Sequence, residues 1–340
     1  MNREKNITIS DVAEALGVSK TTVSRSISGK GRISEETRNR VFAYIQEHHY
    51  KPNVIAKGLA QSKTFNLCVA MPGDYALGEL PFFQEALIGI QQEAGAAEYD
   101  VLLCVCQEDD ISALERIVEN QKVDGVILLR TFVEDAQAAF LARQGVPFVT
   151  AGTLEDETVF QVDHDHERAC RELVTYLLSK ERGGDLPLVF LGGRESIVVN
   201  RKRIDGIRGA YGALGIPFPE ERLYRGLVSD GEIERIVRRS LQEGVGGIVC
   251  LDDRICTLVL RLLRQLSVAV PEQVMVASCY DSAILENNSP AVTAISFPAR
   301  ELGAVCCRQL LKRIEKESAG RRILLPHKLL LRESTKDGPA

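Results

Sequence analysis

Residues 11–53 read DVAEALGVSKTTVSRSISGKGRISEETRNRVFAYIQEHHYKPN, and this stretch decides the kind of protein. The apolar residues between Ile9 and Leu16, where this stretch begins, recur every three or four residues. This spacing places them on one face of a helix. Thr8 and Asp11 form a helix start signal, and Gly17 is typical of the position after a helix. The sequence therefore predicts a first helix that ends at Leu16.

A second helix is predicted over residues 20–28, after a turn at 17–19 that contains glycine, as helix-turn-helix turns often do. One side of this helix is apolar. The other side carries short polar side chains and one arginine at helical spacing: Thr21, Ser24, Arg25 and Ser28. Because such side chains hydrogen-bond base edges and phosphates, the pattern indicates a DNA-binding surface. Periodicity alone leaves open a generic three-helix bundle with a solvated polar face.

A third helix is predicted from Ser34, where Glu35 and Glu36 suit the positive N-terminal end of a helix. Its expected inner face is apolar: Val41, Phe42 and Ile45. The three helices together predict a small all-α headpiece.

The stretch resembles the headpiece of the LacI/GalR family of bacterial regulators almost position by position. The elements D-V-A, G-V-S-x-x-T-V-S-R, G-x-x-R-[VI]-S-x-x-T-R and Y-x-P-N occur in that order. The resemblance implies that helix 20–28 is a recognition helix in the DNA major groove, with Lys20, Thr21 and Arg25 at base-contacting positions. It implies DNA contacts for these headpiece residues: Thr8, Ser19, Lys20, Thr21, Thr22, Ser24, Arg25, Arg32, Ser34 and Thr37.

Residues 51–63 follow as a short segment with helical spacing, set off by Pro52. About two turns of helix are marginal alone in water, so an ordinary flexible linker is the alternative. The segment resembles the hinge helix of the same family, P-N-x-x-A-x-x-L, which pairs in a dimer and enters the minor groove. That resemblance adds three expected DNA contacts: Asn53, Ala56 and Leu59.

Beyond residue 64, short apolar runs alternate with helical stretches, which predicts right-handed β-α-β units and parallel sheets. The predicted strands are 65–71, 101–106, 125–129, 148–151, 188–191, 247–251 and 274–278. The predicted helices are 83–97, 111–121, 136–144, 167–180, 200–214, 232–242 and 254–266. The run is long enough for two such units facing across a cleft, where ligands sit near C-terminal strand ends.

The body resembles the sensor module of the same family, which is similar to periplasmic sugar-binding proteins. The implied fold class is an all-α helix-turn-helix headpiece followed by an α/β module of two doubly wound parallel-sheet subdomains. The expected limits are 1–50 for the headpiece, 51–63 for the hinge helix and 64–340 for the effector-binding domain. Within that domain we expect an N-subdomain of about 64–162 and 296–322, and a C-subdomain of about 163–292 and 325–334.

The resemblance also implies an effector site between the subdomains. Phe82 and Phe83 would wall it, while Arg203 and Asp253 would bind the hydroxyls of a polyol. The full expected set is Phe82, Phe83, Asp165, Ile197, Arg203, Val228 and Asp253. Asp253 also suits the N-cap of a helix starting at Arg254. Ile197, Val199 and Val228 are apolar where some relatives place polar or large aromatic contacts, so no relative's ligand can be assigned to this chain.

Two local charge patterns stay open. Arg194 and Arg201 hint at a phosphorylated or acidic effector, but solvated surface arginines are the preferred explanation. The run from Asp163 to His166 looks like a metal cluster, but alternate residues on a strand-to-helix turn point apart. We therefore prefer ligand contact or helix capping there, and we expect no metal and no cofactor.

Composition limits the class of protein further. The 340-residue chain has a net charge of −5, yet residues 1–60 hold ten Lys and Arg against six Asp and Glu, which suits a head that meets a polyanion. No apolar run approaches the ~20 residues of a membrane span, and no secretory signal is apparent, so we expect a cytoplasmic protein without a membrane partner. The nine scattered cysteines fit buried reduced thiols.

These features predict a sequence-specific DNA-binding transcription regulator, a repressor that acts as a homodimer on operator DNA and responds to a small sugar or sugar-phosphate effector. The alternatives are a purine-type or other corepressor-dependent regulator, and a sugar-binding protein without regulation. An enzyme is not expected, because the chain lacks G-x-G-x-x-G, G-K-[ST] and a Ser-His-Asp elbow motif.

Overall fold

The computed structural model describes residues 7–28, 31–48, 50, 58, 61–74, 81–180, 186–318 and 320–336. The chain divides into two compact units, residues 1–64 and residues 65–340. None of the helices in the described part is long and apolar enough to cross a membrane.

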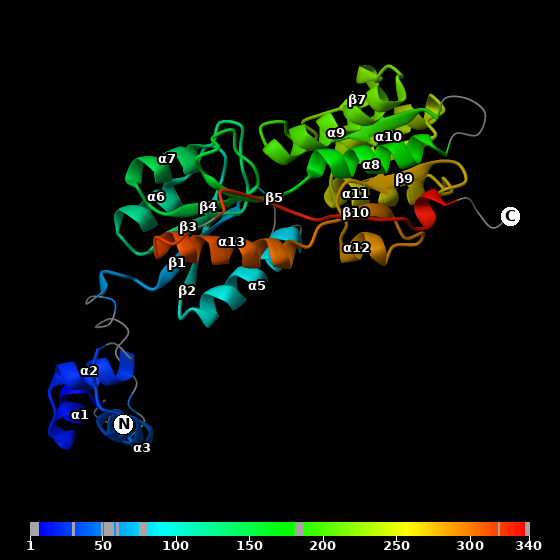
Figure 1. The fold of residues 1–340 in the computed structure, drawn as a ribbon. Coiled ribbons are helices and arrows are strands. Elements are labelled where there is room, and N and C mark those ends of the chain that lie inside the picture. Colours follow the sequence, from blue (N-terminus) through cyan, green and yellow to red (C-terminus); the bar gives the residue numbers. More distant parts are fainter. Residues whose placement is uncertain are drawn as a thin grey trace. The chain divides into compact units, whose positions relative to one another are not determined.

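The described residues of the first unit form the helices α1 (Ile9–Leu16), α2 (Lys20–Ser28) and α3 (Glu35–Glu47) (Figure 1). Local signals set the ends of α1. Thr8 and Asp11 form a capping box in which each side chain accepts the other residue's backbone N–H, at 3.4 and 2.7 Å. Gly17 ends the helix with a φ of 68°, a left-handed conformation that carries no Cβ penalty in glycine.

The core of the headpiece is small and lies between the three helices. Its buried members are Val12, Ala13, Val23, Val41 and Tyr50. Ile45 packs against this core, but Phe42 is 41% exposed, so the prediction that Phe42 lies on the inner face is wrong. Successive helix residues are about 100° apart around the axis. A helix that points Val41 into the core therefore turns Phe42 outward.

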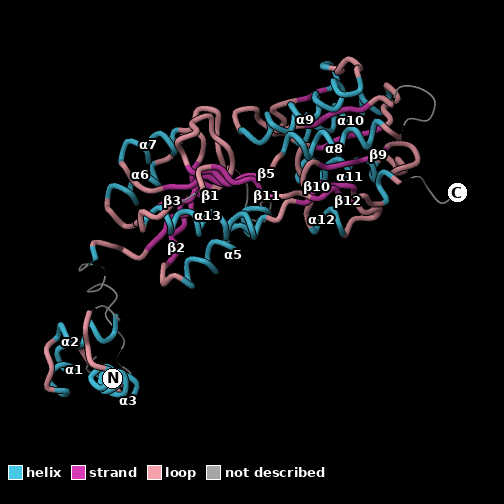
Figure 2. The backbone as a smooth tube through the Cα atoms, in the orientation of Figure 1, coloured by secondary structure: helices cyan, strands magenta, loops and turns pink. Residues whose placement is uncertain are grey.

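The second unit is built on two six-stranded sheets, which we call the first and second half (Figures 1 and 2). The first sheet has the order β11 (Arg322–Leu325), β5 (Phe160–His164), β4 (Phe148–Ala151), β3 (Gly125–Leu128), β1 (Asn66–Pro72), β2 (Asp100–Cys106). The second has the order β12 (Lys328–Leu330), β10 (Thr293–Ser296), β9 (Met275–Ser278), β8 (Gly247–Cys250), β6 (Leu188–Leu191), β7 (Leu223–Tyr224). All pairs are parallel except β10 with β12.

Helices cover both faces of each sheet, and strand alternation decides which residues meet which helices. In β1, Leu67 and Val69 pack toward α5 (Pro81–Ala96) and α13 (Ala299–Ile314), while Cys68 and Ala70 pack toward the opposite helices. The opposite helices of the first half are α6 (Ser112–Glu119) and α7 (Ala136–Gln144). The second half has α8 (His166–Leu178) and α9 (Val198–Leu214) on one face, α10 (Asp230–Gln242) and α11 (Asp253–Gln265) on the other, and a short α12 (Ala283–Glu286). The predicted fold class is confirmed.

The chain passes between the two halves three times. The passages follow β5 at 164–166, β10 at 296–299 and β11 at 325–328. The first sheet thus includes all of β5 and β11, so the first half extends a few residues beyond the expected limits of 162 and 322. Three parallel connections of this kind suit a hinge between the halves.

Helices α8 and α9 cross at very close range. A Cβ added at Gly206 of α9 would overlap with the carbonyl oxygen of Glu167 on α8. At Gly212, on the same helix, an added Cβ would meet nothing within 4 Å. Only the first of these glycines is required by packing.

Candidate DNA-binding surface and ligand cavity

Helix α2 presents a polar surface to solvent and an apolar one to the core. Val23 is fully buried, and the hydroxyl of the buried Ser26 donates to the carbonyl of Thr22 at 2.9 Å. The exposed side chains of α2 and the turn before it include Ser19, Lys20, Thr21, Ser24 and Arg25. All five belong to the residues predicted to contact DNA, and the fold brings them to one face.

The other predicted headpiece contacts gather at helix N-termini. Ser19 accepts the N–H of Thr22 at 3.0 Å, and Ser34 accepts the N–H of Thr37 at 3.2 Å. Thr8 is exposed at the start of α1. Helix N-termini attract anions because their N–H groups and dipoles point outward, so these three ends suit phosphate contacts.

Gly31 makes room for Arg25, and sequence reasoning missed this role. Its φ is 90°, a conformation that favours glycine, and an added Cβ would lie 3.3 Å from Cδ of Arg25. Arg32, next in the chain, is exposed. The predicted contacts Asn53, Ala56 and Leu59 of the hinge lie outside the described residues.

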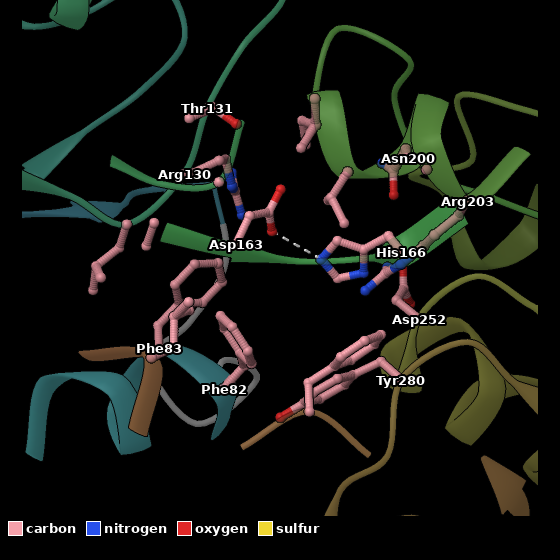
Figure 3. A pocket seen from close by; sticks show the side chains of 18 of the residues that line it. Phe82, Phe83, Arg130, Thr131, Asp163, His166, Asn200, Arg203, Asp252 and Tyr280 are labelled. Carbon is pink, nitrogen blue, oxygen red and sulfur yellow. Dashed lines mark ion pairs between the residues drawn. The ribbon is translucent and has the colours of Figure 1, made fainter. Parts of the chain in front are cut away.

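A cavity of about 1070 Å³, including its open mouth, lies between the two halves of the second unit. It is lined by residues of both sheets, and Figure 3 shows the principal side chains. Five of the predicted effector-binding residues border it: Phe82, Phe83, Ile197, Arg203 and Asp253. The location off the C-terminal strand ends is where open parallel sheets bind ligands.

One wall of the cavity is aromatic. Phe82 of the first half meets Phe83 and Tyr280 edge to face, with ring centroids 5.4 and 5.6 Å apart. Arg130 lies over the Phe83 ring at 5.5 Å and pairs with Asp74 at 2.6 Å, both side chains being less than a tenth exposed. This wall supplies flat apolar surface of the kind that packs against a sugar ring or a heterocycle.

The second half contributes Arg203 and Asp253. Nη1 of the buried Arg203 donates to the carbonyl of Leu251 at 2.6 Å, while its Nε has no partner among the described residues. Burial, together with the neighbouring Asp252, raises the pKa of Asp253 to about 6. The N-cap of α11 is Asp252, whose Oδ1 accepts the N–H of Ile255 at 2.8 Å. Asp253 is therefore not the cap that the sequence allowed, and its carboxylate faces the cavity.

Asp163 and His166 form the floor of the cavity beside Arg203 (Figure 3). Nε2 of His166 lies 3.3 Å from Oδ1 of Asp163. Burial alone would raise the pKa of Asp163, but hydrogen bonds from His166 and Thr153 outweigh it and hold that pKa well below the usual range. Burial lowers the pKa of His166. Burial therefore favours the neutral imidazole, and a proton on Nε2 would donate to Asp163.

Contacts across the cleft hold the two halves together on one side of the cavity. Phe132 and Ile197 form an isolated antiparallel bridge. Ser196 donates its hydroxyl to Glu108 at 2.9 Å. Nζ of Lys202, on α9, donates to the hydroxyl of Thr153 at 2.6 Å. We call the arrangement in which these contacts are formed the closed arrangement.

Two predicted effector residues lie away from the cavity lining. Asp165 caps α8, since its Oδ1 accepts the N–H of Arg168 at 3.0 Å. Val228 is 47% exposed on the loop before α10. The arginines that hinted at an acidic effector are engaged elsewhere. Nη1 of Arg194 lies 3.9 Å from both Asp74 and Glu108, and Arg201 donates to the carbonyl of Glu195.

Several cavity residues were not predicted from sequence. They are Arg130, Thr131, Thr153, Asn200, Asp252, Tyr280 and Phe297. For the run from Asp163 to His166, the sequence favoured ligand contact or helix capping. The structure turns its first and last members into the cavity and uses the third as a cap. In the described part of the chain, no group of three or more His, Cys, Asp or Glu side chains is placed to hold a metal ion.

Comparison with known proteins identifies the family. The model of the bacterial regulatory proteins of the lacI family matches residues 8–53, and that of the periplasmic binding protein-like domain matches residues 162–335. Catabolite control protein A of Streptococcus mutans is 30% identical over 342 residues, covering 99% of this chain and 100% of that protein. This chain belongs to the LacI family. It is a DNA-binding transcriptional regulator.

Solved structures of LacI-family proteins have the same fold. The Lac repressor dimer bound to operator and the anti-inducer ONPF aligns with a TM-score of 0.79 at 25% identity, covering 97% of this chain and 99% of that one. The transcriptional regulator CelR in complex with cellobiose aligns with a TM-score of 0.73 at 27% identity, covering 96% and 99%.

Proposed function

We propose that this LacI-family regulator is a repressor, that it binds operator DNA as a homodimer, and that a small sugar-like effector in the cavity controls it. The observation that carries the proposal is the exposed polar face of α2, where Thr21, Ser24 and Arg25 lie together above a buried Val23. A face of this composition, presented by the second helix of a helix-turn-helix, suits the DNA major groove.

Homodimer formation is supported by the size of the headpiece and by one exposed strand. A single headpiece reads too few base pairs for specificity in a genome. On the edge strand β2, Leu103 and Val105 are 52% and 58% exposed, while Cys104 and Cys106 point into the core. An apolar stripe on a sheet edge is costly to leave in water. A second copy of the chain would cover it.

An effector in the cavity is supported by the chemistry of its walls. Aromatic faces, a buried guanidinium and a carboxylate together match the apolar faces and hydroxyls of a sugar. CelR, a relative of the same fold, is known in complex with cellobiose. A ligand held by both halves would favour the closed arrangement over an open one. The size of this shift is limited by the difference between the ligand's affinities for the two arrangements.

The test is selection of binding sites from random DNA, followed by gel-shift titration with and without candidate sugars. We expect a near-palindromic site that is occupied by two chains and whose affinity changes at least several-fold when a sugar binds. A tight and specific complex with one chain would refute the dimer. If no sugar that binds the protein changes its affinity for DNA, regulation by a sugar effector is refuted.

A further inference from the structure

Two arginines of the first half, which we call the arginine pair, carry positive charge without a carboxylate partner. Arg313 is in the last turn of α13, and Arg321 comes just before β11. The guanidinium of the half-buried Arg313 lies over the ring of Phe160 at 4.5 Å and 5.9 Å from the ring centroid of Phe148. Neither arginine forms an ion pair with an Asp or Glu among the described residues. The charge of the pair is therefore unmatched by the protein.

Both members of the arginine pair lie on the same face of the first sheet. The N–H of Gln161 donates to the carbonyl of Arg321 at 2.7 Å, so Arg321 continues the pairing of β11 with β5. Arg321 alternates with Ile323 and Leu325, which pack on the α13 side. Burial and the charge of Arg321 both lower the pKa of Arg313. Two like charges at a partly buried place repel each other, and an anion between them would remove this repulsion.

The acidic loop before β5 lies on the opposite face of the sheet. Residues 155–157 are Glu, Asp and Glu. Nε2 of Gln161 donates to the carbonyl of Asp156 at 2.8 Å, which places the loop on the face to which Gln161 points. Because Phe160 precedes Gln161 in the strand, its ring points to the other face, together with the arginine pair. These carboxylates therefore lie across the sheet from the pair.

The arginine pair belongs to a short basic segment. Residues 312–322 hold five Lys and Arg against two Glu. We call the five basic residues the basic edge: Lys312, Arg313, Lys316, Arg321 and Arg322. All of them except Arg313 are exposed. The negative end of the α13 dipole can account for Lys312 and Arg313. It does not account for Arg321 and Arg322, which follow the helix by several residues.

The basic edge lies at the end of the first sheet that is opposite to the ligand cavity. The strands β1, β4, β5 and β11 are parallel, so their first residues share one edge of the sheet. Phe160 and Arg322 are the first residues of β5 and β11, whereas the cavity lies off the last residues of the strands. Since β1 also starts at this edge, the chain enters here from the headpiece. Residues 51–64 can span at most ~50 Å, so DNA held by the headpiece stays within reach of a short tether.

We propose that the basic edge is a second DNA contact, at which Arg313 and Arg321 bind backbone phosphates without regard to base sequence. The planar fork of an arginine matches the geometry of a phosphate, and stacking on Phe160 holds one fork in place before DNA arrives. An open surface of exposed side chains suits an extended polyanion better than a small ion, which needs an enclosing pocket. The contact is independent of any effector in the cavity.

The test is the salt dependence of DNA binding by the full chain. Fluorescence anisotropy is measured with a labelled duplex of random sequence between ~50 and ~200 mM salt, because phosphate contacts do not depend on sequence. Each phosphate contact adds ~0.9 to the slope of log affinity against log salt. In Arg313→Gln with Arg321→Gln, we expect the slope to become shallower by about 2 and the affinity at the lowest salt to fall roughly 3- to 10-fold. A slope that stays at the wild-type value overturns the proposal.

The matched control removes two arginines at another place. Arg238 and Arg239 of α10 are exposed, and each pairs with a glutamate four residues away. Replacing both by Gln changes the net charge by the same amount and should leave the slope unchanged. If this control lowers the slope as much, net charge explains the effect and the proposal is wrong. Arg321→Gln alone, at an exposed position, should lower the slope by about 1, which keeps the test valid if loss of the Arg313 stack unfolds the protein.

Calorimetric titration with inorganic pyrophosphate distinguishes DNA from a free phosphate ion as the source of the anion. We expect weak binding, with a Kd above ~1 mM, because an open surface encloses little of a small ion. Pyrophosphate that binds more tightly than this and is lost in the double variant, while the DNA slope is unchanged, would assign the basic edge to a small phosphate and overturn the DNA contact.

Discussion

Lys202 of α9 connects the two halves of the second unit, residues 65–340, which we call the sensor unit. Its ammonium donates to the hydroxyl of Thr153 at 2.6 Å and lies 3.7 Å from the carboxylate of Asp163, both residues of the first half. Since Asp163 is buried, the pair is shielded from solvent on one side. The closed arrangement is thus stabilised by protein groups as well as by any ligand.

Replacing Lys202 by Gln should destabilise the sensor unit. The change removes a charge-assisted hydrogen bond and leaves Asp163 with fewer partners, so we expect a loss of about 1–3 kcal/mol in the free energy of unfolding. Urea unfolding followed by circular dichroism measures it. Arg201→Gln on the same helix, where the side chain is exposed, serves as the control and should change stability by less than about 0.5 kcal/mol.

Arg25→Ala should weaken operator binding by about 1–3 kcal/mol, the range for one good contact to a base. Arg25 is exposed on the polar face of α2, and Gly31 leaves space for its side chain. Fluorescence anisotropy with operator and with random DNA separates base reading from phosphate contact. Equal losses on both DNAs would show that Arg25 contacts only phosphate.

Gly206→Ala should cost about 1–3 kcal/mol or more in stability, because the new Cβ would overlap with the main chain of α8 at Glu167 and force the helices apart. Gly212→Ala is the matched change on the same helix, where the added methyl meets nothing. Alanine is the better helix former, so this second variant should be neutral or more stable by up to about 1 kcal/mol. Thermal unfolding measures the melting temperatures of the two variants. Equal melting temperatures would contradict the packing argument.

Effector affinity should fall as the pH drops below about 6. The pKa of Asp253 without ligand is about 6, and the proposed ligand binds the ionised carboxylate through hydroxyl donors. Binding must then release a proton at low pH, which weakens affinity by at most ~10-fold for each unit below the pKa. Calorimetry between pH 5 and 8 measures the slope. Asp253→Asn should remove most of it, and a slope that persists in this variant would assign the titration to another group.

Leu103→Lys together with Val105→Lys should convert the dimer to a monomer, because two charges would be placed in the proposed interface on β2. Light scattering after size exclusion reports the mass. The control is Leu214→Lys, a residue at the end of α9 that is 49% exposed. A double variant that stays dimeric would move the interface to another surface.

The headpiece is the part that sequence predicts best, because its signals are local. The Thr8 capping box and the left-handed Gly17 lie within a few residues of the helix ends that they set. Phe42 shows the limit of such reasoning: its apolar character suggested burial, but the helix phase that buries Val41 turns it to solvent.

The sensor unit is harder to predict because some of its strands carry polar residues. Strand β5 contains Gln161, Asp163 and His164, all buried, so no apolar run marks it. The strands β10, β11 and β12 are short and return to sheets begun far earlier in the chain.

The site shows the same limit. Arg203 and Asp253 are recognisable from motifs, but no sequence pattern distinguishes the inward Asp163 from Asp165, which caps a helix two residues later.

The three passages between the halves also govern the order in which this protein can be completed during its synthesis. The buried core residues of the headpiece all precede residue 51, so the DNA-reading part can fold as soon as it leaves the ribosome. The first sheet gains its last strand, β11, only at residues 322–325, and the second gains β12 at 328–330. At ~5–20 residues per second, a nascent chain carries a finished head for roughly 15–60 seconds before either half of its sensor is whole. During that interval the head is tethered to the ribosome, and the pairing proposed above would keep such unfinished chains from occupying operators.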